Sequence, residues 1–527
     1  MAASAEVPCS ASRAGPRDRW LVPDLSLIAA GVALLYCLAL SGGAEKFFRD
    51  SDTGWHIRTG EAILATAALP TADSYSFTRG GQRWYAWEWG ADVLMGAAHR
   101  LGGLPGVALL YGLAIACGVW LWFRLHWAVE GNFFVACAMA APMLTTTSLH
   151  WLARPHVLSW LLLLVAVRQA ERVSGPLPHG RGSVSACAVV TAVWANLHGS
   201  FILAPAMALV YAGGHFLRPW IWQVDARVER AKARWFVLAA AAALLGSLAN
   251  PYGWNLHRHL LAYLADRELL ARVGEFQSFN FHAEGAFQMV LALALAALGG
   301  VLALGQGRLA QFFFAAVLLV AALRSARGLP LVALLLLPLA NGAITEALRQ
   351  AGGLQVPLRR RLDGFLEYSD RLRRLDSRGQ GWAWVPVLLL AAVLWVRTPD
   401  VAARVGFPAE EFPVAAAAAV DRLEEDARLL APDKYGGYLI YRFEGRRKVF
   451  FDGRSDFYGV EFMKRYIRLM QVRPGWRAEL ERWGFTHALL PNDYSLVAAL
   501  EAVGWRRLYR DGVATLLERP VVLTSGF

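Results

Sequence analysis

Long apolar runs alternate with short polar segments over the first 400 residues of the chain. A helix needs about 20 mainly apolar residues to cross the hydrocarbon core of a bilayer. We predict a membrane-spanning helix in each run that approaches that length. These eleven runs are 21–40, 104–123, 132–148, 155–170, 186–197, 200–217, 235–250, 284–304, 310–323, 328–347 and 382–398. The break around 196–199 leaves a second interpretation open, a re-entrant turn in place of two separate crossings.

Two regions depart from this pattern of apolar runs. In the predicted first exterior loop, 41–103, the residues Trp89, Val93, Ala97 and Leu101 recur every four positions. That stripe indicates an amphipathic helix on the membrane surface, and apolar residues before Pro70 indicate a second one. After 398 the composition changes, and short alternating segments predict an α/β domain. We expect strands at 427–430, 448–451, 487–490 and 513–517, and helices at 457–470 and 474–483.

These patterns predict three parts of the chain. The first part, 1–20, is a cytoplasmic tail. The second, 21–398, is the membrane domain, which includes the first exterior loop 41–103 and a basic loop at 348–381. The third, 399–527, is the small α/β domain. The predicted fold class is an α-helical polytopic membrane protein of about eleven spanning helices with a small C-terminal α/β soluble domain.

Composition agrees with a membrane protein and explains the charge. The chain has 527 residues, of which 56% are hydrophobic and 18% charged, and its mean hydropathy is +0.36. Its net charge of +12 falls mostly on alternate loops, above all on 348–381. We therefore assign the basicity to membrane orientation and not to nucleic acid. An N-terminus in the cytoplasm then leaves the C-terminal domain outside. The sequence has no Walker loop, which disfavours an ATP-driven pump.

Two carboxylates, Asp50 and Asp52, directly follow the first apolar run. A carboxylate beside a low-dielectric wall has a raised pKa, which moves it toward the range of a general base. Spacing alone leaves two interpretations open, a catalytic pair and an ordinary charge cluster at the membrane boundary. Two carboxylates alone make a weak metal site, so the metal ligands are unknown and a divalent cation stays open as a cofactor.

Other charged and polar residues lie at the predicted exterior ends of helices. Such groups at membrane depth are candidates for function, although a single one is more often a cap or an anchor. We expect several of them to converge with the two carboxylates and to hold a phosphate or another anionic group. They are His56, Arg58, Arg154, His156, His198, Arg258, Arg324 and Arg327.

Several short motifs resemble bacterial membrane proteins related to the GT-C superfamily of glycosyltransferases, which use polyprenyl-phosphate sugars as donors. The motifs are Asp52-Thr53-Gly54-Trp55-His56-Ile57-Arg58-Thr59-Gly60-Glu61, Asp73-Ser74-Tyr75-Ser76-Phe77-Thr78, Trp84, Glu88-Trp89, Gly436-Gly437-Tyr438-Leu439-Ile440 and Val449-Phe450-Phe451-Asp452-Gly453-Arg454. The resemblance implies that Asp52, and less so Asp50, is the acidic residue of the first exterior loop. It also adds Glu88 to the substrate-binding candidates. The sequence departs from the adjacent Asp-Glu of the protein mannosyltransferase and aminoarabinose transferase branches and has Asp50-Ser51-Asp52 instead.

The implied activity is an inverting transfer of a sugar from a polyprenyl-phosphate donor to a glycan, lipid or protein acceptor. It implies a bacterial inner membrane location, with transfer on the periplasmic side, and membrane lipids as further partners, with no nucleic acid. Two alternatives stay open, a non-catalytic scaffold of an envelope glycan or glycoprotein assembly complex, and a transporter or flippase for lipid-linked saccharides. A transporter is expected to have ionisable residues near helix centres and internal repeats, and the sequence offers neither.

Overall fold

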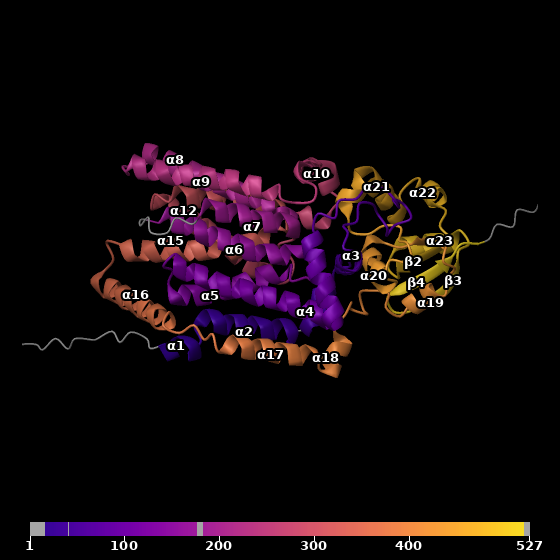
Figure 1. Cartoon of the computed structure of the whole chain (residues 1–527), viewed down its shortest axis with the longest axis horizontal. Coiled ribbons are helices and arrows are strands. Elements are labelled where there is room, and N and C mark those ends of the chain that lie inside the picture. The colour runs from indigo at the N-terminus through magenta and orange to yellow at the C-terminus, as the bar shows by residue number, and fades with distance from the viewer. Residues whose placement is uncertain (1–15, 41, 176–182, 521–527) are drawn as a thin grey trace, which may run out of the picture.

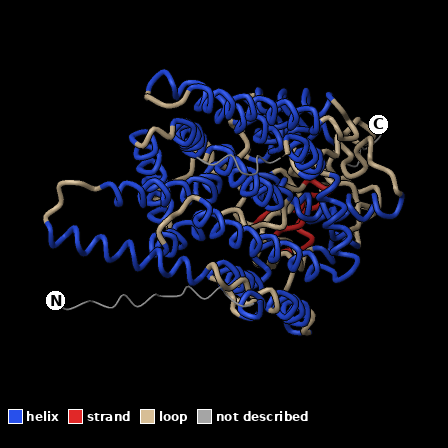
Figure 2. Tube along the Cα trace, turned by 60° about the vertical axis from the view of Figure 1, so that its left-hand side comes forward, coloured by secondary structure: helices blue, strands red, loops and turns tan. Residues whose placement is uncertain are grey.

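The computed structural model describes residues 16–40, 42–175 and 183–520, and most of them are helical (Figure 1). Residues 1–15 of the predicted N-terminal tail lie outside this description. A short helix, α1 (Pro16–Leu21), precedes the first long one. The main helices run roughly along the long axis of the molecule, and Figure 2 shows that the strands are confined to one region of it.

Each predicted apolar run contains a helix. They are α2 (Leu25–Leu38), α4 (Trp89–Ala128), α5 (Phe133–Ser148), α6 (Pro155–Ser174), α7 (Val184–Leu197), α8 (Leu203–Ile221), α9 (Ala226–Ser247), α12 (Ala286–Gly305), α13 (Leu309–Arg324), the consecutive α14 (Gly328–Leu331), η4 (Val332–Leu336) and α15 (Leu337–Gln350), and α17 (Trp384–Val396). In the described residues, five helices have the length and apolar composition needed to cross a bilayer, and four apolar helices are shorter. The polytopic membrane class is confirmed, and the number of eleven crossings stays a prediction.

The first exterior loop is folded and continuous with the helix that follows it. It contains η1 (Gly43–Phe48) and α3 (Asp52–Thr66), and then an irregular segment up to Glu88. The amphipathic stretch that begins at Trp89 forms the first part of α4. A kink separates this part from the apolar part, because Gly103 has φ +61°, a left-handed conformation that glycine adopts without strain.

The C-terminal region contains a four-stranded sheet in the order β1-β2-β4-β3. Strand β1 pairs with β2 in parallel, and the other pairs are antiparallel, with Leu489 opposite Leu516. The elements are α18 (Pro399–Arg404), α19 (Ala417–Asp421), β1 (Leu429–Leu430), α20 (Asp433–Arg442), α21 (Ser455–Met470), α22 (Trp476–Trp483), β2 (His487–Pro491), α23 (Ser495–Ala502), β3 (Arg506–Arg510) and β4 (Ala514–Glu518). A small α/β domain is therefore confirmed.

The prediction of a strand at 448–451 was wrong for this sheet. Val449 instead forms an isolated parallel bridge with Ser76 of the first loop. This apolar segment therefore pairs with the loop and not with the sheet. Strand β3 was not predicted, because its five residues are mostly polar and exposed at the sheet edge.

The two ends of the helical bundle carry different structures. The α/β domain lies at one end, next to α3 and to α10 (Trp254–Ala265) (Figure 1). The short α11 (Arg267–Leu270) contacts α21 of that domain, and η3 (Gly274–Phe276) follows α11. The basic segment lies at the other end and forms α16 (Val356–Asp376). Helices that begin near the α/β domain therefore end near α16, or the reverse.

Candidate functional site

Close contacts between glycines allow the C-terminal domain to lie directly against α3. A Cβ atom on Gly54 of α3 would lie 2.1 Å from the carbonyl oxygen of Gly437 in α20, and a Cβ on Gly437 would lie 2.1 Å from that of Ser51. A Cβ on Gly453 would lie 1.8 Å from Oδ1 of Asp52. These glycines thus allow the C-terminal domain to contact the membrane domain at Asp52.

A buried ion-pair network holds the same two regions together. The Nη2 atom of Arg454 lies 2.8 Å from Oδ1 of Asp73 in the first loop and 2.7 Å from Oδ2 of Asp452. The guanidinium also lies 4.6 Å from the ring centre of Trp84. Burial alone would raise the pKa of Asp73, but Arg454 and a hydrogen bond from Ser76 lower it. The motif residues far apart in sequence therefore form one structural unit.

Asp52 begins α3 and belongs to a cluster of three carboxylates around one guanidinium. Its Oδ2 atom lies 2.9 Å from Nη2 of Arg154. Asp50 and Glu275 each place an oxygen 2.8 Å from Nη1 of Arg154. Glu275 also accepts a hydrogen bond of 2.6 Å from Nε of Arg327. We call these five residues the Arg154 cluster.

The exposure of the side chains increases across the cluster, from the buried Asp52 to the rim formed by Glu275 and Arg327. The side chain of Asp52 is 9% exposed, whereas those of Glu275 and Arg327 are 30% and 38% exposed. Burial raises the pKa of Asp52 to about 7, and the neighbouring Asp50 and Glu275 oppose the lowering effect of Arg154. Burial also acts on Glu275, but Arg154 and Arg327 bring its pKa below the ordinary value. Near neutral pH, Asp52 can exchange a proton while Glu275 stays ionised.

A second group of polar residues lies beside the cluster, and three of its members are largely uncharged near neutral pH. Nδ1 of His56 lies 2.6 Å from Oδ1 of Asp92, and its Nε2 lies 3.8 Å from Oε2 of Glu88. Nε2 of His198 lies 3.4 Å from the other oxygen of Glu88. Burial raises the pKa of Glu88 to about 8 and lowers that of His198 to about 3. Burial lowers the pKa of His56 as well, so both imidazoles are neutral and the Glu88 carboxyl is largely protonated.

The remaining predicted site residues lie in other surroundings. Arg58 pairs with Glu61 and donates to the carbonyl oxygen of Tyr441, so it supports the contact between α3 and α20. Nε2 of His156 lies 2.9 Å from the carbonyl oxygen of His150, and its ring centre lies 6.4 Å from that of His198. Arg258 and Arg324 are exposed, and neither side chain forms a hydrogen bond or ion pair with another described residue. Among the described residues, Arg154 is the predicted cation that contacts Asp50 and Asp52, and Arg327 joins them through Glu275. Arg58, Arg258 and Arg324 form no such contact.

Glu275 belongs to the cluster although the sequence did not predict it. It is a single acid in a short irregular stretch between helices, with no motif around it. The only signal was its place on a predicted exterior segment. As for metals, no three His, Cys, Asp or Glu side chains of the described residues are grouped as ligands of one ion, and the carboxylates of Asp50 and Asp52 are turned toward Arg154.

Comparison with solved structures identifies the fold. No protein-family model and no curated protein matches the sequence. The oligosaccharyltransferase of Archaeoglobus fulgidus, solved with a tethered acceptor peptide containing the NVT sequon, superposes with a TM-score of 0.52 over 88% of this chain and 68% of its own, at 10% identity. ArnT from Cupriavidus metallidurans in the apo state gives 0.47 over 93% and 96% of the two chains, at 13% identity. ArnT bound to undecaprenyl phosphate gives 0.40, at 12% identity over 95% and 98%. The likeness to the oligosaccharyltransferase shows that this chain shares its fold.

Proposed function

On the premise of the GT-C fold, we propose that this chain is a membrane glycosyltransferase that moves a sugar from a polyprenyl-phosphate donor to an acceptor. The observation that carries the proposal is Asp52, a buried carboxyl with a pKa of about 7 that contacts Arg154 at the junction of the two domains. A general base works best when its pKa lies near the working pH. Fold alone does not fix function, so the proposal depends on this site.

The proposed reaction assigns the role of general base to Asp52. The acceptor oxygen or nitrogen bonds to the anomeric carbon while the bond from that carbon to the phosphate oxygen breaks. Asp52 takes the acceptor proton, and the polyprenyl phosphate leaves with the electron pair. One displacement inverts the anomeric configuration.

Proton transfer to Asp52 also makes the site more positive while the phosphate leaves. In the resting site, Asp50, Asp52 and Glu275 share the guanidinium of Arg154. When Asp52 becomes neutral, Nη2 of Arg154 loses its anionic partner. Its positive charge then becomes available to the leaving phosphate, together with that of Arg327 at the rim.

The neutral group beside the cluster suits the sugar. A protonated Glu88 donates a hydrogen bond, and the neutral rings of His56 and His198 offer both a donor and an acceptor nitrogen. A carboxyl kept protonated by its surroundings is an established way to bind a polar substrate without adding charge. We assign Glu88, His56 and His198 to the hydroxyl groups of the donor sugar.

The proposed location is the bacterial inner membrane, with the C-terminal domain on the periplasmic side. The basic helix α16 lies at the opposite end of the bundle from that domain. Positively charged segments are retained in the cytoplasm during insertion. The Arg154 cluster is then exterior, as the donor chemistry requires.

Substitution of Asp52 tests the proposal. The full-length chain is purified in detergent and incubated with a panel of undecaprenyl-phosphate sugars and an envelope extract as acceptor source, and release of undecaprenyl phosphate is measured. We expect Asp52→Asn to lower the transfer rate by about 10²–10⁴-fold, the usual contribution of a general base. The control, Asp400→Asn, changes an exposed acid outside the cluster and should keep the wild-type rate. A rate for Asp52→Asn equal to that of the control would remove Asp52 from the mechanism.

A further inference from the structure

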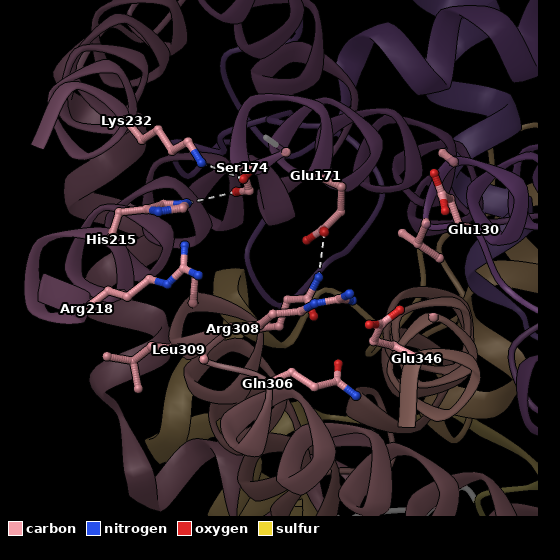
Figure 3. A pocket seen from close by; sticks show the side chains of 18 of the residues that line it. Glu130, Glu171, Ser174, His215, Arg218, Lys232, Gln306, Arg308, Leu309 and Glu346 are labelled. Carbon is pink, nitrogen blue, oxygen red and sulfur yellow. Dashed lines mark hydrogen bonds between the residues drawn. The ribbon is translucent and has the colours of Figure 1, made fainter. Parts of the chain in front are cut away.

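A second cavity, of about 360 Å³, lies at the end of the bundle remote from the Arg154 cluster (Figure 3). It is lined by the last residues of α4, α6, α8 and α15, the first turn of α13 and one residue of α9. Helix α6 relates the two sites, because Arg154 precedes its first residue and Ser174, its last, lines the cavity. At 1.5 Å per residue, its 20 residues place the cavity about 30 Å from the cluster, roughly one bilayer core away.

Cationic groups enter this cavity from two neighbouring elements. The side chain of Arg308 lines it and forms no hydrogen bond or ion pair with any residue that the structure describes. Arg218 binds Glu229 through Nη1 at 3.0 Å, but its Nε is buried and has no partner among the described residues. Figure 3 shows Arg218 and Arg308 in the wall of the cavity, with the side chain of Arg308 extending toward Glu346. Two guanidinium groups of this wall therefore hold unused donors.

The first turn of α13 adds backbone donors to the same wall. The N–H of Phe312 bonds to the carbonyl oxygen of Arg308. The three N–H groups before it, from Leu309 to Gln311, therefore have no partner within the helix. Aligned peptide dipoles give the start of a helix of 16 residues a partial positive charge that favours anions, phosphate among them.

Two residues of the lining also carry acceptors without a partner among the described residues. Gln311 is only 8% exposed, and its Oε1 accepts no hydrogen bond from them, whereas its Nε2 donates to Glu171 at 2.6 Å. Oε1 of Gln306 is likewise buried and has no partner among them. Buried acceptors are normally satisfied, so these two amide oxygens indicate a ligand that carries hydroxyl groups in addition to its anionic part.

The balance of charge in the lining limits the negative charge that a ligand can carry. The lining contains four cations, Arg218, Lys232, Arg308 and Arg349, and three acids, Glu130, Glu171 and Glu346. Arg349 already pairs with Asp370, and Lys232 donates to the carbonyl oxygen of Ser174. One phosphate matches the unused donors of Arg218, Arg308 and α13, whereas a polyphosphate or nucleic acid would meet three carboxylates.

We propose that this cavity binds a phosphate ester that carries hydroxyl groups, on the membrane face opposite the Arg154 cluster. The phosphate contacts Arg308, Arg218 and the first turn of α13, and the hydroxyls donate to Gln306 and Gln311. A volume of about 360 Å³ lies at the lower end of small-molecule sites, about 300–1,000 Å³. A lipid headgroup such as glycerophosphate and a soluble ester such as glycerol 3-phosphate share this chemistry.

Binding to the full-length chain in neutral detergent tests the inference. Native mass spectrometry is used to titrate phosphatidylglycerol, with phosphatidylcholine as a phosphate lipid without headgroup hydroxyls, and glycerol 3-phosphate serves as competitor. We expect Arg308→Gln to weaken phosphatidylglycerol binding by about tenfold, as for the loss of one charge-assisted contact. Arg308→Lys should keep most of the affinity. The matched control, Arg360→Gln, removes an exposed arginine of α16 and should bind as the wild type does.

Two further comparisons separate the sources of the ligand and keep the inference open to refutation. If glycerol 3-phosphate displaces the lipid, the ligand of the cavity is a soluble ester. If the lipid binds and is not displaced, the ligand is a lipid headgroup. Gln306→Leu should remove the preference for phosphatidylglycerol over phosphatidylcholine even if Arg308→Gln fails to fold. Equal binding to wild type, Arg308→Gln and Gln306→Leu, or no binding of either ester to the wild type, overturns the proposal. Asp52→Asn should leave this affinity unchanged, because the inference does not rest on the transferase activity.

Discussion

Three carboxylates, Asp50, Asp52 and Glu275, share the guanidinium of Arg154, and this shortage of positive charge sets the chemistry of Asp52. Glu275 has a second cation, Arg327, and stays ionised. Asp52 is more buried and has only its share of Arg154, so burial raises its pKa to about 7. The acid that is least well paired is thus the one that can accept a proton.

The raised pKa of Asp52 predicts the pH dependence of transfer. A general base acts in its deprotonated form, so the reactive fraction falls about tenfold per pH unit below a pKa of about 7 and is constant above it. We expect kcat/KM for the donor to rise with pH up to about 7 and to fall above about pH 8, where Glu88 loses the proton that it donates to the sugar. The residual transfer of Asp52→Asn should lack the rising limb. A wild-type rate that does not change between about pH 5 and pH 7 would contradict the assignment.

At the residue scale, the sequence predicts part of the site. Asp50, Asp52 and Arg154 stand next to the ends of apolar runs, where exterior polar groups are easy to recognise. Glu275 could not be predicted, because nothing in the neighbouring sequence distinguishes it from an ordinary acidic residue in a loop. For Arg58 the motif was misleading. It suggested a substrate-binding residue, but the side chain donates to the carbonyl oxygen of Tyr441. Side-chain direction depends on packing that only the folded chain defines.

At the scale of elements, the approach of α20 to α3 positions Asp52. Ser51 and Gly437 are in backbone contact, and Gly453 leaves no space between the domain and the Asp52 carboxylate. In an ordinary exposed helix, Gly→Ala stabilises by about 1 kcal/mol. At Gly437 the sign should reverse, because the added methyl group would overlap the carbonyl oxygen of Ser51.

We therefore expect Gly437→Ala to destabilise the protein by about 1–3 kcal/mol, the usual cost of overpacking. It should lower the thermal unfolding midpoint in detergent and make the C-terminal domain more susceptible to limited proteolysis. Gly512→Ala provides the control in the same domain, because its added Cβ would have no atom within 4 Å. If both variants unfold at the wild-type temperature, the contact between α3 and α20 does not fix Asp52.

Elements with a strong apolar period were predictable, and those that depend on partners were not. Long helices such as α12 follow directly from their composition. The segment 448–451 has the residues of a strand, but its partner is Ser76 and not the sheet. Sequence shows that a segment is extended, whereas the choice of partner depends on the docking of a loop almost 400 residues away.

At the scale of the whole molecule, the bundle separates two polar sites by the thickness of a membrane. The Arg154 cluster and the α/β domain lie at one end, and the cavity at Arg308 and the basic helix α16 lie at the other. Apolar runs and the distribution of arginines predicted that the site residues and the basic segment 348–381 lie on opposite faces. They did not predict the cavity, because its lining comes from six helices that are distant in sequence.

Cysteine labelling tests the orientation of the two ends. In a background without the five native cysteines, Arg506→Cys, in β3, should react with a membrane-impermeant maleimide in intact spheroplasts, because that side chain is 72% exposed. Arg360→Cys, in α16, should react only after the membrane is permeabilised. Labelling of Arg360→Cys alone in intact spheroplasts would place the Arg154 cluster in the cytoplasm and remove the proposed donor chemistry.

The most direct measurement for the central claim is an electron cryomicroscopy map of the full-length chain with undecaprenyl phosphate. The account predicts density for the phosphate within hydrogen-bonding distance of Arg327 or Arg154, about 3–4 Å, with Asp52 facing the same space. Loss of this density in an Arg327→Gln variant, with the fold intact, would strengthen the assignment. Phosphate density found only at the opposite end of the bundle, with none near the Arg154 cluster, would contradict it.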